Sequence, residues 1–157
     1  MNNNWIGVRS IPSVSSGKWY FEVYIDESGT SNWVIIGAAT SAAALTYPGS
    51  DTNGYGYNGN NGYKFYGGSS SSYGDSYTDD DIIGVALDLD NGEIYFAKNN
   101  VWQNNSDPAA RTNPAYTGLS GIFFAMAGMY HDVEQVTSQF DSGEQTYSPP
   151  SGFTSLC

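Results

Sequence analysis

DDIIGVALDLDNGEIYFAKN, residues 80–99, is the stretch of sequence that decides the fold. Its two halves, residues 82–90 and 93–99, are rich in the β-branched and aromatic residues that are typical of strands. Asn91 and Gly92 separate the halves, and both residue types tolerate the positive φ that a type I′ turn requires. The stretch therefore predicts two antiparallel strands joined by a tight hairpin turn.

Strand patterns also dominate the sequence on both sides of this hairpin. Residues 18–26 (KWYFEVYID) alternate with a period of two, and the face that we expect to be buried carries Trp19, Phe21, Val23 and Ile25. Further strands are expected at residues 7–11, 32–40, 56–58, 63–66, 121–129 and 133–140. No segment of useful length has the 3.6-residue period of a helix. The sequence therefore predicts an all-β fold, either a sandwich or a barrel.

Composition and charge exclude several classes of function. The chain of 157 residues suits one domain, and its net charge is −11, from 16 acids and 5 scattered bases. Without a cluster of bases it is not expected to bind nucleic acid or an anionic membrane surface. The longest apolar run, residues 121–130, is too short for a membrane-spanning helix of about 20 residues. The single cysteine, Cys157, allows no internal disulfide.

Five short motifs follow one another along the chain. They are SGKWYFEV (16–23), VIIGAA (34–39), the block at residues 80–99, FFAM (123–126) with TSQF (137–140), and SPPSGFTSL (148–156). In this order they resemble the SPRY (B30.2) family over residues 18–156. The resemblance implies a bent β-sandwich of two antiparallel sheets, of the concanavalin-like jelly-roll type. It also implies a binding module without catalytic activity. The sequence assigns no cofactor and no metal-ligating residue.

Two further features are most similar to SPRY-like, lectin-like modules of bacteriophage structural and tail-fibre proteins. They are the Tyr/Gly/Ser-rich middle of the chain and its Pro-Pro-Ser-Gly-Phe ending. This similarity implies a module on the virion or extracellular surface that recognises a host surface glycan or protein. Residues 1–157 are then one domain of a longer protein, which could also make it oligomeric. The alternative is a structural or decoration module that contacts other virion subunits.

Loop-like stretches at residues 46–53, 67–81 and 100–118 supply the candidate ligand-binding residues. Loop tyrosines mixed with Ser, Gly and Asn combine rigid amphipathic rings with adaptable hydrogen bonding, as antibody binding loops do. The resemblance adds residues 129–132, the turn that contributes contacts in peptide-binding members of the family. The alternative is that these rings only cover the ends of the sheets. The candidates are Tyr47, Tyr73, Asp75, Tyr77, Trp102, Asn104, Tyr130 and His131.

A glycine pattern at residues 54–59 (GYGYNG) matches the G-x-G-x-x-G of dinucleotide-binding loops. That loop works by leading a strand into a helix whose N-terminus meets the pyrophosphate. Here the next residues are NNGYKFY, which do not predict a helix. The pattern therefore predicts a hairpin that turns at residues 59–62, with some of its tyrosines facing the core.

Ionisable residues suggest three further sites that the sequence supports less well. Asp88, Asp90 and Glu93 are compatible with a calcium loop or a retaining glycosidase, but they flank a hairpin and are expected on its solvent face. A calcium ion bound near Asp75 and residues 79–81 remains an open alternative to a solvated loop. His131, the only histidine, has no nucleophile elbow to serve, so no catalytic residue is assigned.

Overall fold

Thirteen β-strands and one short 3₁₀ helix make up the regular structure of residues 4–157, the part of the chain that this computed structural model describes. No α-helix occurs within these residues. The elements are β1 (Ile6–Val14), β2 (Lys18–Glu27), β3 (Val34–Thr40), β4 (Gly54–Asn58), β5 (Tyr63–Tyr66), β6 (Ser69–Ser72), β7 (Ile82–Asp88), β8 (Glu93–Lys98), β9 (Val101–Trp102), η1 (Gln103–Asn105), β10 (Tyr116–Thr117), β11 (Phe123–Met129), β12 (Gln135–Gln139) and β13 (Thr154–Ser155).

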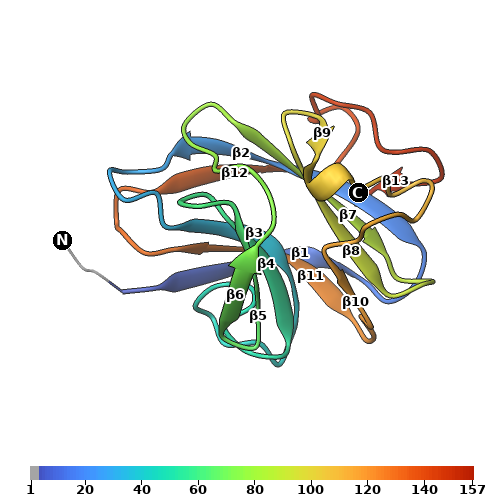
Figure 1. Cartoon of the computed structure of the whole chain (residues 1–157), viewed down its shortest axis with the longest axis horizontal. Helices are drawn as coiled ribbons and strands as arrows, with labels where there is room; N and C mark the ends of the chain where they lie inside the picture. The colour runs from blue at the N-terminus through green and yellow to red at the C-terminus, as the bar shows by residue number, and fades with distance from the viewer. Residues whose placement is uncertain (1–3) are drawn as a thin grey trace.

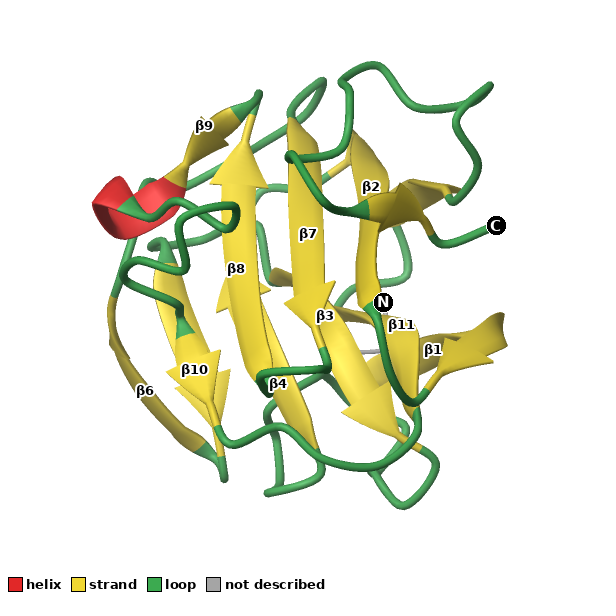
Figure 2. Ribbon diagram, turned by 90° about the vertical axis from the view of Figure 1, so that its right-hand side faces the viewer, coloured by secondary structure: helices red, strands yellow, loops and turns green. Residues whose placement is uncertain are grey.

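The strands form two sheets that pack face to face (Figure 1). The six-stranded sheet has the order β1-β11-β3-β4-β5-β6. The seven-stranded sheet has the order β10-β8-β7-β2-β12, with β9 beside β8 and β13 beside β2. Figure 2 shows β7 and β8 in front of β3 and β4. All pairs are antiparallel except β13 with β2, and the prediction of an all-β sandwich of two antiparallel sheets is confirmed.

The hairpin predicted at residues 80–99 is present, but its turn is of another type. β7 pairs with β8 from Ile83↔Lys98 to Asp88↔Glu93, which leaves residues 89–92 in the turn. Of these only Gly92 has a positive φ, of 68°, so the expected type I′ turn is wrong. The longer turn is closed by Asp88, whose carboxylate accepts the backbone N–H of Asn91 at 3.1 Å and its side-chain amide at 2.8 Å.

The main core lies between the sheets, where apolar residues of alternating positions meet. Phe21 and Ile25 of β2, Ile36 of β3 and Phe96 of β8 are completely buried there. The opposite face of β2, expected to be solvent-facing, is buried at Tyr20 and Glu22. Its Glu22 is 0% exposed because residues that follow β12 cover it and donate their backbone N–H groups to its carboxylate. Trp19, expected in the core, is only partly buried.

A loop formed by residues 41–53 lies flat on the outer face of the six-stranded sheet. It can do so because the sheet presents glycines beneath it. A Cβ on Gly128 would lie 2.4 Å from Tyr47 Cβ, and one on Gly56 would lie 2.2 Å from the Pro48 carbonyl oxygen. Gly7, which pairs with Gly128, donates its N–H to the carbonyl of Leu45 at 3.0 Å. Because these glycines have no side chain, the loop can pack directly against the backbone of the sheet.

The glycine-rich hairpin is confirmed as strands β4 and β5 with a turn at residues 59–62. Tyr55 and Tyr57 face the core, whereas Tyr63 and Tyr66 are each 37% exposed. The loops expected at residues 67–81 and 100–118 contain the short strands β6, β9 and β10. Within the described residues, no helix is both long enough and apolar enough to span a membrane.

Candidate functional site

Four aromatic rings gather at one end of the six-stranded sheet and form the aromatic pocket, which consists of Trp5, Trp33, Tyr47 and Tyr130. The Trp5 ring lies 4.5 Å from that of Tyr47 and 5.3 Å from that of Tyr130, measured between centroids. Its distance to the Trp33 ring is 6.1 Å, with the two planes nearly perpendicular. Trp5, Trp33 and Tyr130 line a cavity of about 280 Å³.

The strand register explains why these residues meet. β11 lies between β1 and β3, and Met129 is the partner of both Ile6 and Val34. Each ring belongs to a residue just beyond one of these three positions: Trp5 before β1, Trp33 before β3 and Tyr130 after β11. Tyr47 joins them from the loop that lies on the sheet glycines. The pocket is therefore assembled from four separate segments of the chain.

A buried carboxylate holds two of these segments together. Glu134 is 5% exposed and follows the turn between β11 and β12. Its carboxylate accepts the backbone N–H of Trp33 at 3.0 Å, of Tyr130 at 2.6 Å and of His131 at 3.1 Å. Charge-assisted hydrogen bonds of this kind are among the stronger ones in proteins. Glu134 therefore holds the backbone of Trp33 and Tyr130 in place, and with it the position of their rings.

The aromatic pocket suits an apolar or aromatic side chain of a partner. Trp33 remains 36% exposed, and Trp5 and Tyr130 are half-buried. Tryptophan and tyrosine are the residue types most enriched where a few side chains dominate the binding energy. Because the rings already contact one another, little rotational freedom is lost when a ligand enters.

A second cavity, the polar pocket, lies beside the 3₁₀ helix, which Figure 2 shows in red next to β9. It has a volume of about 340 Å³ and is formed by two segments of the chain. Its lining residues are Ser72, Tyr73, Gly74, Asp75, Val101, Trp102, Gln103, Asn104 and Asn105. None of them is Lys or Arg, and most carry hydroxyl, amide or carboxylate groups.

The candidate residues taken from the sequence are divided between these two pockets. Tyr47 and Tyr130 belong to the aromatic pocket, and the His131 ring lies 4.9 Å from that of Tyr130. Of the remaining candidates, Tyr77 lies in neither pocket. The others line the polar pocket, and they are Tyr73, Asp75, Trp102 and Asn104. A ligand-binding role for the exposed and half-buried members remains a prediction.

Tyr73 and Tyr77, expected as exposed loop rings, are instead part of the core. They are 8% and 1% exposed, and their rings pack on that of Tyr57, at 5.7 and 5.0 Å. The Tyr77 hydroxyl donates to backbone carbonyls, with the Tyr57 oxygen at 2.7 Å. Burial raises the pKa of Tyr73 to about 12 and raises that of Tyr77 well above its ordinary value. The expectation of exposed rings is wrong because strands β4 and β8 pack directly on them.

Trp5 and Trp33 are the members of the aromatic pocket that sequence reasoning missed. Trp33 was expected inside a strand at residues 32–40, whereas β3 begins at Val34. Both tryptophans directly follow an asparagine at the start of an apolar run. That position, where a strand begins, is the signal that could have marked them as rings at a sheet end.

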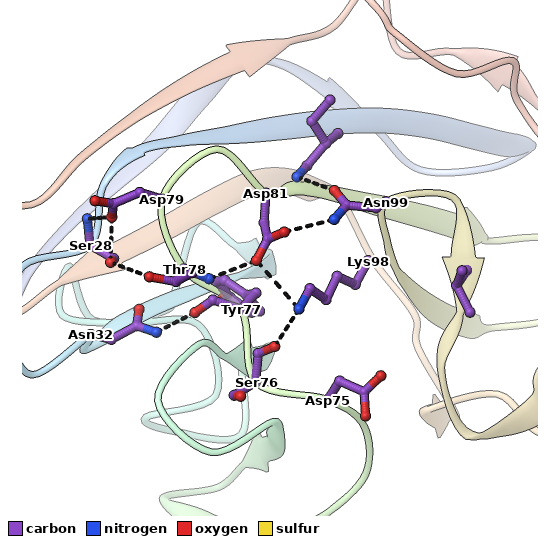
Figure 3. A network of polar contacts seen from close by, with 12 residues as sticks. Ser28, Asn32, Asp75, Ser76, Tyr77, Thr78, Asp79, Asp81, Lys98 and Asn99 are labelled. Atoms are coloured by element: carbon purple, nitrogen blue, oxygen red, sulfur yellow. Dashed lines mark hydrogen bonds and ion pairs between the residues drawn. The ribbon is translucent and has the colours of Figure 1, made fainter.

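The acidic stretch at residues 79–81 is engaged within the protein (Figure 3). Asp79 accepts the N–H and the hydroxyl of Ser28 at 2.7 and 2.5 Å, and these bonds lower its pKa. Asp80 accepts the hydroxyl of Tyr24, and Asp81 forms an ion pair with Lys98 at 3.4 Å. In the described residues no group of three His, Cys, Asp or Glu side chains could hold a metal ion. The open calcium alternative therefore has no preformed site.

Asp88 and Glu93 are not on a solvent face, as had been expected. They are 0% and 7% exposed, and each is paired with a base: Lys18 at 3.0 Å and Arg111 at 2.7 Å. The hydrogen bond from Arg111 lowers the pKa of Glu93. Burial alone would raise the pKa of Asp88, but hydrogen bonds from Asn91 and Lys18 lower it. A general acid needs a raised pKa, so this pair fits structural ion pairs rather than glycosidase chemistry.

Two stacked antiparallel sheets, with pockets built from loops and strand ends, define the class of β-sandwich binding domains. The family model of the SPRY domain matches residues 18–130, so the chain belongs to the SPRY domain family. SPRY domains mediate protein–protein interactions and are generally non-catalytic binding modules.

Two other proteins contain a region that is similar in sequence to this chain. One is ATP-dependent RNA helicase DDX1 of Xenopus laevis, 37% identical over 95 residues, which are 60% of this chain and 12% of that protein. The other is Ran-binding protein 9 of Xenopus tropicalis, 35% identical over 85 residues, which are 53% of this chain and 16% of that protein. The matched region is thus a small part of either relative.

Two solved structures share the fold. A human SPRY domain is similar with a TM-score of 0.69 and 20% identity, over 88% of this chain and 86% of that one. The SPRY domain of human HERC1 is similar with a TM-score of 0.70 and 17% identity, over 92% of this chain and 86% of that one. At these identities the likeness establishes the fold alone.

Proposed function

We propose that this domain binds a protein partner by inserting an apolar or aromatic side chain of that partner into the aromatic pocket. The observation that carries the proposal is the cavity of about 280 Å³ that Trp5, Trp33 and Tyr130 line, with the Tyr47 ring packed against that of Trp5. Binding through a pocket at a strand end agrees with the interaction role of SPRY domains, and with the name of one relative, Ran-binding protein 9.

The pocket has the two properties that a recognition site needs. It offers apolar surface, because Trp33 keeps 36% of its surface exposed although it contacts two other rings. It is also preorganised, because Glu134 and the glycine-supported loop hold its walls in place before a partner arrives. The net charge of the whole chain, −11, favours a partner segment that is neutral or basic around its anchoring side chain.

The parent protein and its location are a further part of the proposal. The Tyr/Gly/Ser-rich middle and the Pro-Pro-Ser-Gly-Phe ending support a phage virion protein, such as a tail fibre, that displays the domain outward. The partner is then a protein on the host cell surface. The same pocket serves equally in a decoration module, where the partner is another virion subunit.

Peptide display tests the proposed site directly. A random peptide library is selected on the immobilised domain, and the recovered peptides are titrated against variants. Trp33→Ala is expected to weaken binding by at least about tenfold, the loss expected for a central aromatic residue. Tyr63→Ala is the matched control, since Tyr63 is 37% exposed and Trp33 is 36% exposed.

The control variant is expected to bind as the unmodified domain does. Peptides that bind Trp33→Ala and the unmodified domain equally would overturn the proposal. Binding of the labelled domain to whole bacterial cells, lost in Trp33→Ala, is the result expected of a host-recognition module. Binding only to purified virion subunits would support the decoration role instead.

A further inference from the structure

The polar pocket differs chemically from the aromatic pocket and uses none of its residues. It is lined by hydroxyl, amide and carboxylate groups around one tryptophan, Trp102, and its volume is about 340 Å³. That volume lies within the range of about 300–1,000 Å³ that is usual for small-molecule sites. Since the proposed protein partner occupies the other pocket, this one has no assigned ligand.

Gln103 connects the two segments that form the polar pocket. It is 4% exposed, and its Oε1 accepts the backbone N–H of Asp75 at 2.8 Å while its Nε2 donates to the Val101 carbonyl at 2.8 Å. Gly74 makes this approach possible, because a Cβ there would lie 2.6 Å from Gln103 Oε1. The pocket is therefore held open by an internal bond and does not depend on a ligand for its shape.

The asparagines at the rim of the pocket have an unusual backbone. Asn104 and Asn105 have φ values of 57° and 52°, and the nearby Asn99 and Asn100 have values of 47° and 66°. Left-handed conformations at residues other than glycine carry strain and concentrate at functional sites. Here two successive asparagines, Asn104 and Asn105, line the same cavity.

The polar groups of this pocket are available for a ligand. Asp75, Asn104 and Asn105 are exposed and Trp102 is half-buried. The hydrogen bonds of Asp75 and Asn105 within residues 4–157 involve their backbone atoms. Figure 3 shows Asp75 apart from the network that engages Asp79 and Asp81. Each asparagine amide both donates and accepts, and the carboxylate accepts. The ligand must therefore offer hydrogen-bond donors and acceptors in close succession.

We propose that the polar pocket binds a neutral saccharide. The hydroxyl groups of a sugar match the mixed donors and acceptors of Asp75, Asn104 and Asn105, and its C–H face matches the Trp102 ring. That ring also contacts the ring of Tyr20, at 6.2 Å between centroids. The absence of Lys and Arg from the lining residues, together with the net charge of −11, disfavours anionic sugars and phosphates.

The test is an NMR titration of the domain with neutral oligosaccharides built from glucose, galactose, mannose or N-acetylglucosamine. The four tryptophans give four indole N–H signals, of which those of Trp5 and Trp33 report on the aromatic pocket and that of Trp102 reports on the polar pocket. At least one of these oligosaccharides is expected to shift the Trp102 signal and the side-chain amides of Asn104 and Asn105. The signals of Trp5 and Trp33 are expected to stay in place.

Two variants make the result specific. Asn104→Gly keeps the left-handed backbone and removes the amide, and it is expected to weaken saccharide binding about tenfold, as the loss of two hydrogen bonds would. Asp75→Ala removes the exposed carboxylate and is expected to act in the same direction. Trp33→Ala is expected to bind the oligosaccharide unchanged.

Three outcomes would overturn the proposal. They are a Trp102 signal that no neutral oligosaccharide shifts, a shift confined to Trp5 and Trp33, and undiminished binding by Asn104→Gly. A peptide that binds in the polar pocket would equally contradict it. None of these results bears on the protein partner, because that site is tested by Trp33→Ala and lies elsewhere.

Discussion

The two pockets of this domain are held together in the same way but offer different chemistry. One buried polar side chain organises each: Glu134, 5% exposed, in the aromatic pocket and Gln103, 4% exposed, in the polar pocket. Glu134 accepts three backbone N–H groups, whereas Gln103 accepts one and donates to one carbonyl. The first pocket then presents rings, and the second presents amides and a carboxylate.

The difference follows from where each pocket lies. The aromatic pocket lies where three neighbouring strands of one sheet begin or end. The large aromatic residues next to the ends of these apolar strands therefore come together there. The polar pocket lies between residues 72–75 at the end of β6 and residues 101–105 of β9 and η1, where asparagines with positive φ turn the chain. The place of each pocket in the fold therefore determines which side chains it presents, and the supporting polar residue decides only how firmly each pocket is held.

The largest expected effect comes from replacing the glycine beneath the aromatic pocket. In Gly128→Ala the new Cβ would lie 2.4 Å from Tyr47 Cβ and 2.7 Å from the Thr46 carbonyl oxygen. Such overpacking is expected to lower the free energy of unfolding by about 3 kcal/mol. Urea unfolding measures this loss, and the signals of the polar pocket should remain unchanged.

Gly143→Ala is the control for that experiment. Its Cβ would meet only the side chain of Asp141, at 3.1 Å, so its stability should stay close to that of the unmodified domain. If Gly128→Ala were as stable as this control, the glycine support of the aromatic pocket would be refuted.

Removal of the carboxylate of Glu134 is expected to have the next largest effect. Glu134→Ala leaves three backbone N–H groups without their acceptor, and should lower the free energy of unfolding by about 2 kcal/mol. Hydrogen exchange at Trp33, Tyr130 and His131 should accelerate. Glu134→Gln keeps one acceptor oxygen and should lie between. Unchanged exchange in Glu134→Ala would mean that these segments are held by ring packing alone.

Gln103→Ala is the corresponding change in the polar pocket and should be milder. It removes one bond to the Asp75 N–H and one to the Val101 carbonyl, whereas Glu134→Ala removes the acceptor of three N–H groups. A loss of about 1 kcal/mol is expected, with faster exchange at the Asp75 amide. A loss as large as that of Glu134→Ala would contradict the difference drawn between the two pockets.

The smallest effect is expected for Glu93, which belongs to neither pocket. Because the bond from Arg111 lowers the pKa of Glu93 in the folded protein, its charge stabilises the fold above the ordinary pKa of 4.5. This contribution is lost as the pH falls through the lowered pKa. The midpoint temperature of thermal unfolding should therefore fall more steeply below pH 4.5 for the unmodified domain than for Glu93→Gln. Parallel curves would show that the ion pair does not contribute.

The fold could be read from the sequence because its signals are local. The alternation at residues 18–26 and the hairpin at residues 80–99 depend on neighbours along the chain. The burial of Glu22 could not be read in this way, since its cover comes from Thr146 and Tyr147, more than a hundred positions away. The type I′ turn failed because Asp88 closes a longer turn with its side chain.

The site was predicted only in part, for a related reason. Tyr47, Tyr130, Asp75, Trp102 and Asn104 lie at the pockets, since loop composition marks residues near a surface. Composition cannot distinguish a ring that points outward from one that a neighbouring strand covers. For that reason loop composition predicts Tyr73 and Tyr77 at the surface, although both are buried. Conversely, loop composition does not mark Trp5 and Trp33, because each residue directly precedes a strand.

The most direct test of the central claim is an NMR titration with a peptide selected on the aromatic pocket. The indole N–H signals of Trp5 and Trp33 should shift with the same dissociation constant. Those of Trp19 and Trp102, which lie outside the pocket, should remain in place. A peptide that shifted the Trp102 signal and left those of Trp5 and Trp33 unchanged would contradict the assignment of the aromatic pocket as the partner-binding site.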